Sequence, residues 1–222
     1  MGALIGGRWR AVLLDLDGTL IDSEPGHQAA YQQFFAARGW DVDTETRRHF
    51  RGRRGSDVFA TMPGPWAGED PDALVAEVLS YLDPQAAPPE PTLGAAEFVR
   101  TTHARGVPIA LVTSANRAWA EYAVGELLGL RECFSTLVTW EDVVDGKPDP
   151  GPYLAGAAAL HVPPAEAMAI EDTVPGVESA ARAGIGRVVA VTTTTDEKSL
   201  LGAGAHRVVT SLADLVPSGA PG

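Results

Sequence analysis

Six short apolar runs recur along this chain, at residues 11–14, 108–112, 136–138, 168–170, 187–191 and 207–209. Polar residues, glycine or proline bound each run, and most positions within the runs are aliphatic. Apolar runs of this length without polar alternation are typical of strands buried on both faces, as in a parallel sheet. The sequence therefore predicts a central sheet covered on both sides.

Helical patterns lie between the later apolar runs, at residues 93–104, 119–128, 153–160 and 175–183. Gly106, Gly129 and Gly184 follow three of these patterns, and glycine commonly ends a helix. Strands that alternate with helices are the signature of an α/β fold. We therefore expect a doubly wound parallel sheet.

A long segment separates the first apolar run from the second, whereas an ordinary crossover needs only about a dozen residues. It contains four further helical patterns, at residues 26–38, 44–50, 56–61 and 72–82. Residues 22–25 lead into it, and a proline-rich stretch leads out. We expect an α/β core domain formed by residues 1–23 and 91–222, and a small inserted α-helical domain at 24–90 that can open and close as a lid.

Composition narrows the class of protein. Acidic residues outnumber lysine and arginine by 29 to 17, a net charge of −12, so no nucleic-acid partner is expected. No apolar run approaches the ~18 residues of a membrane span, and residues 1–10 do not resemble a secretory signal. Cys133 is the single cysteine, which fits a reducing compartment. We expect a cytoplasmic protein without a membrane partner.

The first apolar run leads directly into Asp15-Leu-Asp17-Gly18-Thr-Leu. On an extended backbone, carboxylates two residues apart point the same way, and Gly18 permits a turn that other residues resist. Ligands of open α/β sheets bind at the carboxyl ends of the strands. Two acids at such an edge favour a hard cation such as Mg²⁺. Taken alone, the Asp-x-Asp pair also fits a turn with solvated acids. Glycosyltransferases and other metal enzymes use such pairs too.

Three more motifs follow in order: Thr113-Ser114 after the second apolar run, Gly146-Lys147-Pro-Asp-Pro, and Ile-Glu171-Asp172-Thr. Together with the first motif they make the chain resemble the haloacid dehalogenase superfamily. The likeness extends from residue 11 to about residue 215. The inserted helical segment is similar to the cap of the β-phosphoglucomutase-like and sugar-phosphatase branch.

This resemblance implies that Asp15 is a nucleophile that forms an aspartyl-phosphate. Asp17 would act as the general acid and then the general base. Asp15, the backbone carbonyl of Asp17, Glu171 and Asp172 would hold Mg²⁺. Read alone, Glu171-Asp172 also suits a helix N-terminus, where acids complement the helix dipole.

The resemblance also implies a phosphate site made by the Thr113 hydroxyl, the Ser114 backbone and the side chains of Asn116 and Lys147. Ser114 or Asn116 also fits a simple helix N-cap, and the two roles are compatible. Lys147 is one of only two lysines in a chain with fifteen arginines. Its presence indicates a need for a compact point charge.

Five arginines fall within residues 47–54, which is conspicuous in an acidic chain. A loop is a better specificity element than the middle of a helix, so Arg53 or Arg54 is expected to grip the substrate. Glu24 and His27 lie just after the first motif and are further candidates for the substrate cleft or for a contact with Asp17. Some of the arginines are expected to be solvated.

The predicted activity is a Mg²⁺-dependent phosphatase acting on a small phosphorylated sugar or polyol, working as a monomer. A hexose-phosphate mutase like β-phosphoglucomutase is the alternative, but its cap uses a lysine and residues 24–90 contain none. Phosphonate cleavage in the superfamily needs such a lysine too, and the dehalogenases lack an acid at the position of Asp17. A phospho-accepting receiver domain also carries an aspartate and a lysine on a doubly wound sheet, but it lacks an inserted cap.

Overall fold

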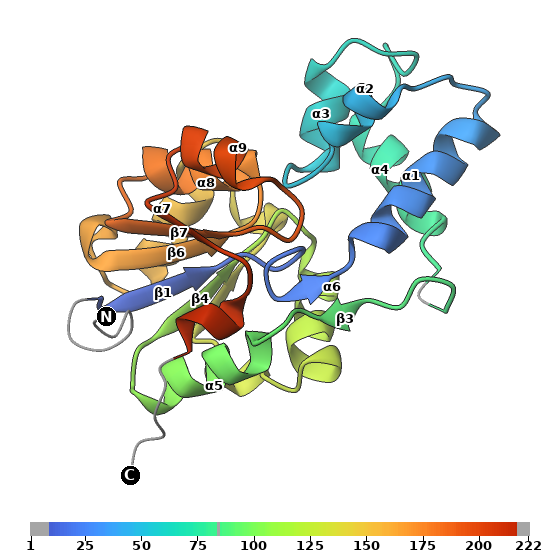
Figure 1. The fold of residues 1–222 in the computed structure, drawn as a ribbon. Coiled ribbons are helices and arrows are strands. Elements are labelled where there is room, and N and C mark those ends of the chain that lie inside the picture. Colours follow the sequence, from blue (N-terminus) through green and yellow to red (C-terminus); the bar gives the residue numbers. More distant parts are fainter. Residues whose placement is uncertain (1–8, 84, 217–222) are drawn as a thin grey trace.

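The computed structural model describes residues 9–83 and 85–216 (Figure 1). Six parallel strands form one sheet in the order β5-β4-β1-β6-β7-β8. They are β1 (Ala11–Leu14), β4 (Ile109–Val112), β5 (Thr136–Val138), β6 (Ala167–Glu171), β7 (Arg187–Val191) and β8 (Arg207–Val209). Each strand coincides with one of the six apolar runs, so the predicted doubly wound sheet is confirmed.

Helices cover both faces of the sheet (Figure 1). One face carries α5 (Ala95–Ala104), α6 (Arg117–Tyr122) and a π-helical turn (Ala123–Leu127); the other carries α7 (Gly151–Ala159), α8 (Val174–Arg182) and α9 (Glu197–Gly202). Successive β1 side chains alternate between the faces, with Leu14 in the core beside α5 and Leu13 in the core beside α7. Sequence patterns predicted the flanking helices except α9.

The order of the strands places a ligand crevice beside β1. The chain runs from β1 to β4 on one side and later to β6 on the other, so the connections diverge at the carboxyl end of β1. Leu14 is paired with Leu111 in β4 and with Ile170 in β6. The residues that follow these three positions therefore lie at the same edge of the sheet.

The segment between β1 and α5 forms four helices with a hydrophobic core of their own. They are α1 (Glu24–Ala37), α2 (Thr44–Arg48), α3 (Gly55–Thr61) and α4 (Pro71–Ser80). Their core is rich in aromatic rings, including Phe34, Phe50, Phe59 and Trp66. We call residues 24–90 the cap; the division of the chain at these residues stays a prediction.

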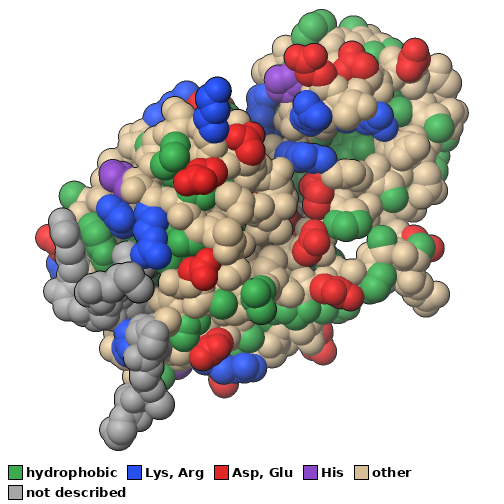
Figure 2. Space-filling view, in the orientation of Figure 1, with side chains coloured by type: hydrophobic (Ala, Val, Ile, Leu, Met, Phe, Trp, Pro, Cys, Tyr) green, Lys and Arg blue, Asp and Glu red, His purple; other side chains and the backbone are tan. Residues whose placement is uncertain are grey.

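Two short strands join the cap to the sheet. β2 (Ile21–Asp22) and β3 (Glu90–Pro91) pair antiparallel, so the entering and leaving chains lie side by side. Beyond them, the cap lies over the carboxyl ends of the large sheet (Figure 1). Lys and Arg side chains gather where the cap borders the core (Figure 2). Within the described ranges, no helix is both long and apolar enough to cross a bilayer.

Candidate active site

Three buried carboxylates meet at the carboxyl edge of the sheet. Asp15 follows β1, Glu171 ends β6 and Asp172 comes next. One carboxylate oxygen from each lies within 4.8 Å of the others. Gly18 makes this approach possible, because its φ is +85° and a Cβ there would lie 2.0 Å from Asp172 Oδ2. The structure therefore brings together residues from the first and fourth sequence motifs.

Lys147 supplies the positive charge at this cluster. Its Nζ donates to Asp15 Oδ1 at 2.6 Å, to Glu171 Oε1 at 2.5 Å and to the Val112 carbonyl at 3.0 Å. The side chain is only 2% exposed. A single compact ammonium thus joins the ends of three neighbouring strands, which fits the prediction that this position needs a point charge.

The sequence reasoning missed Tyr153, which lies beside the lysine. Its hydroxyl donates to Glu171 Oε1 at 2.8 Å, and its ring lies beneath the Lys147 ammonium at 5.4 Å. The second Glu171 oxygen accepts from the Thr173 hydroxyl at 3.1 Å. Because Glu171 already has these partners, the protein fixes its orientation. No local signal marked Tyr153, since an aromatic residue in an alanine-rich helix reads as ordinary core packing.

The cluster carries an excess of negative charge. Burial, and then the neighbouring Glu171, raise the pKa of Asp15 to about 7. Burial, Asp15 and Glu171 also raise the pKa of Asp172 well above its usual range. Burial alone would lower the pKa of Lys147, but the carboxylates of Asp15 and Glu171 raise it overall. Three carboxylates share one ammonium, so full ionisation leaves the charge that one divalent cation would balance.

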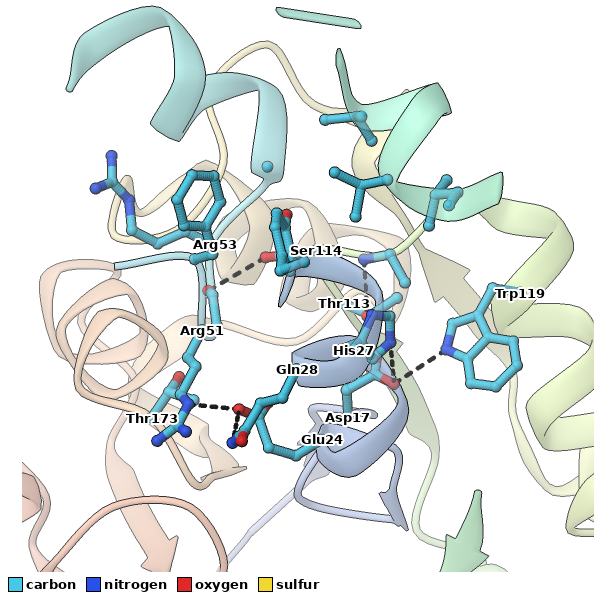
Figure 3. Close-up of a pocket in the computed structure, with 18 of the residues that line it drawn as sticks. Asp17, Glu24, His27, Gln28, Arg51, Arg53, Thr113, Ser114, Trp119 and Thr173 are labelled. Atoms are coloured by element: carbon cyan, nitrogen blue, oxygen red, sulfur yellow. Dashed lines mark hydrogen bonds and ion pairs between the residues drawn. The ribbon is translucent and has the colours of Figure 1, made fainter. Parts of the chain in front are cut away.

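Asp17 faces away from this cluster, toward α1 and α6. Its Oδ1 accepts from the Ser23 hydroxyl at 2.5 Å. The same oxygen accepts from Trp119 Nε1 at 3.0 Å, and His27 Nε2 lies 3.9 Å away (Figure 3). The structure thus brings His27 to Asp17, one of the two placements expected for it. No sequence pattern marked the donor role of Trp119.

Three of the four predicted phosphate-binding residues line one cavity with Asp15. The Thr113 hydroxyl accepts from the backbone N–H of Ala115 at 3.0 Å. Asn116 Oδ1 accepts from the Trp119 backbone N–H at 2.7 Å, so Asn116 is the N-cap of α6. The Ser114 hydroxyl faces the Gly52 carbonyl of the cap at 3.4 Å (Figure 3). Thr113, Ser114 and Asn116 all line the cavity, whereas Lys147 lies beneath it.

The cavity has a volume of about 640 Å³ and lies between the sheet edge and the cap. Glu24, His27, Arg51 and Arg53 are among the cap residues that line it. Glu24 is paired with Arg51 and accepts from Gln28 (Figure 3). Buried aliphatic side chains of α4 and the Trp119 ring complete the wall. The volume falls within the range of about 300–1,000 Å³ that is typical of small-molecule sites.

The structure separates the two arginines that were expected to grip the substrate. Arg53 lines the cavity, and its buried Nε has no hydrogen-bond partner among the described residues. Arg54 is not part of the cavity wall; its guanidinium donates to the carbonyls of Trp140, Val143 and Val144 in the core. Of the two candidates, the structure places Arg53 at the cavity and directs Arg54 to the core. The extended backbone here (Arg54 φ −63°, ψ 126°) directs neighbouring side chains to opposite sides.

Comparison with known proteins places this geometry in a family. The family model for haloacid dehalogenase-like hydrolases matches residues 9–184. This chain is a haloacid dehalogenase-like hydrolase. The hydrolase is 37% identical over 193 residues to validoxylamine A 7'-phosphate phosphatase of Streptomyces hygroscopicus subsp. limoneus, a match that covers 86% of this chain and 90% of the relative.

Two further matches support the assignment of the chain to this family. A phosphorylated carbohydrates phosphatase of Thermotoga maritima is 31% identical over 90% of this chain and 93% of the relative. The crystal structure of CbbY from Rhodobacter sphaeroides in complex with phosphate superposes with a TM-score of 0.77. That match has 27% identity and covers 93% of this chain and 96% of the other. The family suggested by the four sequence motifs is confirmed.

Proposed function

We propose that this hydrolase is a Mg²⁺-dependent phosphatase that releases phosphate from a small phosphorylated sugar or polyol. The observation that carries the proposal is the cluster of Asp15, Lys147, Glu171 and Asp172, at one end of a cavity bordered by basic cap residues. The two named phosphatase relatives, one of them acting on phosphorylated carbohydrates, support the reaction and the class of substrate.

Asp15 is the proposed nucleophile. Lys147 holds its Oδ1, whereas Oδ2 has no hydrogen-bond donor among the described residues. Oδ2 attacks phosphorus, the bond from phosphorus to the ester oxygen breaks, and an aspartyl-phosphate forms. Only the ionised carboxylate is nucleophilic, and the adjacent ammonium favours that form while it offsets the repulsion between two anions.

Asp17 is the proposed general acid and base. Its carboxyl group protonates the departing sugar or polyol oxygen and then takes a proton from the water that hydrolyses the aspartyl-phosphate. Ser23 and Trp119 hold the same oxygen of Asp17, which leaves the other oxygen for proton transfer. Thr113, Ser114 and Asn116 lie along the cavity wall, where they would bind the phosphoryl oxygens.

The residues present fit Mg²⁺. The three buried carboxylates repel one another, which raises the pKa of Asp15 and Asp172, and they offer only oxygen donors. Such oxygen ligands are the ones that this hard cation prefers. Asp15, Asp172, the Asp17 backbone carbonyl and Glu171 would hold it, directly or through water. When bound, Mg²⁺ would neutralise phosphoryl charge and align the phosphate with the nucleophile.

The cap is proposed to select the organic part of the substrate. Arg53 lines the cavity, and Glu24, His27 and Gln28 offer donors and acceptors that suit hydroxyl groups. We propose Glu24, His27 and Arg53 as the specificity residues.

Phosphate release from a panel of sugar and polyol phosphates, with Mg²⁺ and with EDTA, tests the proposal. We expect Mg²⁺-dependent release from at least one sugar or polyol phosphate, and a loss of at least 10³-fold in Asp15→Asn. Conversion of β-glucose 1-phosphate to glucose 6-phosphate without free phosphate would identify a mutase. Full activity in EDTA, or in Asp15→Asn, would contradict the proposed chemistry.

A further inference from the structure

Arg54 makes an extensive contact between the cap and the core. It precedes α3, where the chain between α2 and α3 dips toward the sheet (Figure 1). Its guanidinium donates to the carbonyls of Trp140 at 2.8 Å, Val143 at 3.0 Å and Val144 at 3.0 Å. The Arg54 side chain is 14% exposed. Within the described residues, the Val143 and Val144 carbonyls accept from no other donor, so this contact is made by Arg54 alone.

A second contact lies one turn further along α3. Asp57 Oδ2 accepts from the Gly146 backbone N–H at 3.3 Å. A Cβ at residue 146 would lie 2.7 Å from that carboxylate oxygen and 3.4 Å from the Cβ of Arg54. The cap therefore packs directly on the backbone of Gly146, the residue before Lys147. Residues 140–146, which we call the docking loop, are held on the cap side by Arg54 and Asp57.

The docking loop directly precedes Lys147 and helps to set the position of the Lys147 backbone. A lysine side chain has four rotatable carbons, so the position of its ammonium depends on how well its backbone is held. Here the ammonium must reach Asp15 at 2.6 Å and Glu171 at 2.5 Å at once. Displacement of the loop shifts the base of this side chain, and misplacement of a catalytic group by about 1 Å is costly in catalysis.

We propose that Arg54 is a positioning residue that couples closure of the cap to the placement of Lys147. When the cap is docked, the guanidinium ties three carbonyls of the docking loop together, and the loop presents the lysine to the nucleophile. When the cap is open, these carbonyls are solvated and the loop keeps only its core contacts, such as those of Asp142 with Thr139 and Arg117. The catalytic consequence rests on the proposed phosphatase function, whereas the docking itself does not.

Cap position can be measured without any substrate. The native thiol of Cys133 is buried, so spin labels can be attached at exposed positions through Ala73→Cys on α4 and Leu201→Cys on α9. Electron–electron double resonance should give one dominant distance in the otherwise wild-type chain. Arg54→Ala should shift most of the population to longer distances. An unchanged distribution would overturn the docking role.

A matched control comes from the cap itself. Arg38 is bonded to Glu69 and Glu77, all three within the cap, so Arg38→Ala removes a cap arginine without touching the docking loop. It should leave the distance distribution unchanged. Arg54→Lys keeps the charge but replaces the two guanidinium nitrogens that reach these carbonyls with a single ammonium, so it should lie between the wild type and Arg54→Ala. A shift as large in Arg38→Ala as in Arg54→Ala would contradict the proposal.

Kinetics separate positioning from substrate recognition. If Arg54 acts through Lys147, Arg54→Ala should lower kcat at least tenfold on a sugar phosphate and on p-nitrophenyl phosphate alike, with partial rescue in Arg54→Lys. A loss confined to the sugar phosphate would show that Arg54 binds substrate and would overturn the proposal. If the wild type hydrolyses neither compound, the proposed function fails, and the distance measurement still confirms or refutes the docking.

Discussion

Asp15→Asn should stabilise the metal-free protein while it abolishes activity. The substitution keeps the shape of the side chain and removes one of three clustered negative charges. Burial and Glu171 raise the Asp15 pKa from 3.8 to about 7, and at ~1.4 kcal/mol per pKa unit this costs about 4 kcal/mol above pH 7. The buried amide is a weaker acceptor for Lys147, so we expect a net gain of about 1–3 kcal/mol.

The sign of the pH dependence follows from the raised pKa. Between about pH 4 and pH 7 the folded protein keeps a proton on Asp15 that the unfolded chain has lost. The folded state therefore binds more protons, and this contribution to wild-type stability falls as pH rises through that window. The asparagine variant lacks the contribution. The advantage of the variant should thus be small near pH 4.5 and largest above pH 7.

Urea unfolding in EDTA at several pH values between 4.5 and 8 measures this difference. Asp41→Asn, at an exposed position in the cap, is the matched control and should show no such trend. Addition of Mg²⁺ should stabilise the wild type more than Asp15→Asn, because the variant lacks a ligand. The reasoning fails if the wild type is as stable as Asp15→Asn at pH 8 in EDTA, or if the difference does not grow with pH.

Three further substitutions test other contacts. Gly52→Ala should lower kcat/KM at least tenfold in a phosphate-release assay, because residue 52 has φ +67° and a Cβ there would lie 2.3 Å from Thr173 Oγ1. Tyr153→Phe should cost about 1–2 kcal/mol in urea unfolding, since it removes a buried donor to Glu171. Trp119→Phe keeps an aromatic ring but loses the donor to the acid/base carboxylate. It should slow turnover of alkyl phosphates more than formation of the phospho-enzyme from p-nitrophenyl phosphate, and equal slowing of both would count against it.

The sheet and most helices are predictable because their signals are local. A strand buried on both faces must be apolar along its whole length, so runs such as 187–191 are visible without any knowledge of their neighbours. The β2–β3 pair is different. Each of its strands has two residues, and Ile21 pairs with Pro91 because the segment that leaves the cap lies beside the segment that enters it. A contact of that kind depends on tertiary structure and leaves no periodic pattern.

The same division holds within the candidate site. Asp15, Asp17 and Lys147 stand in short motifs, whereas Tyr153 and Trp119 reach the site from helices that otherwise read as packing. Arg53 and Arg54 show the limit most clearly. Adjacent arginines in one loop have the same composition signal, yet one lines the cavity and the other binds core carbonyls. Successive side chains of an extended backbone point to opposite sides, so only one of the two arginines can face the cavity. Which one does so depends on how the cap is placed on the core.

The folded protein therefore holds its reactive cluster at an energetic cost, and the cap contributes to holding it. The carboxylates of Asp15, Glu171 and Asp172 repel one another when they are ionised. Movement of the Lys147 ammonium away from them would therefore leave their negative charge unbalanced. The Lys147 ammonium is held at the sheet edge, and its backbone follows a loop that rests on Arg54 and Asp57 on the cap side. On the proposed coupling, the charged cluster is fully assembled when the cap is docked on the core, and closure of a cap also serves to keep water from the reacting groups.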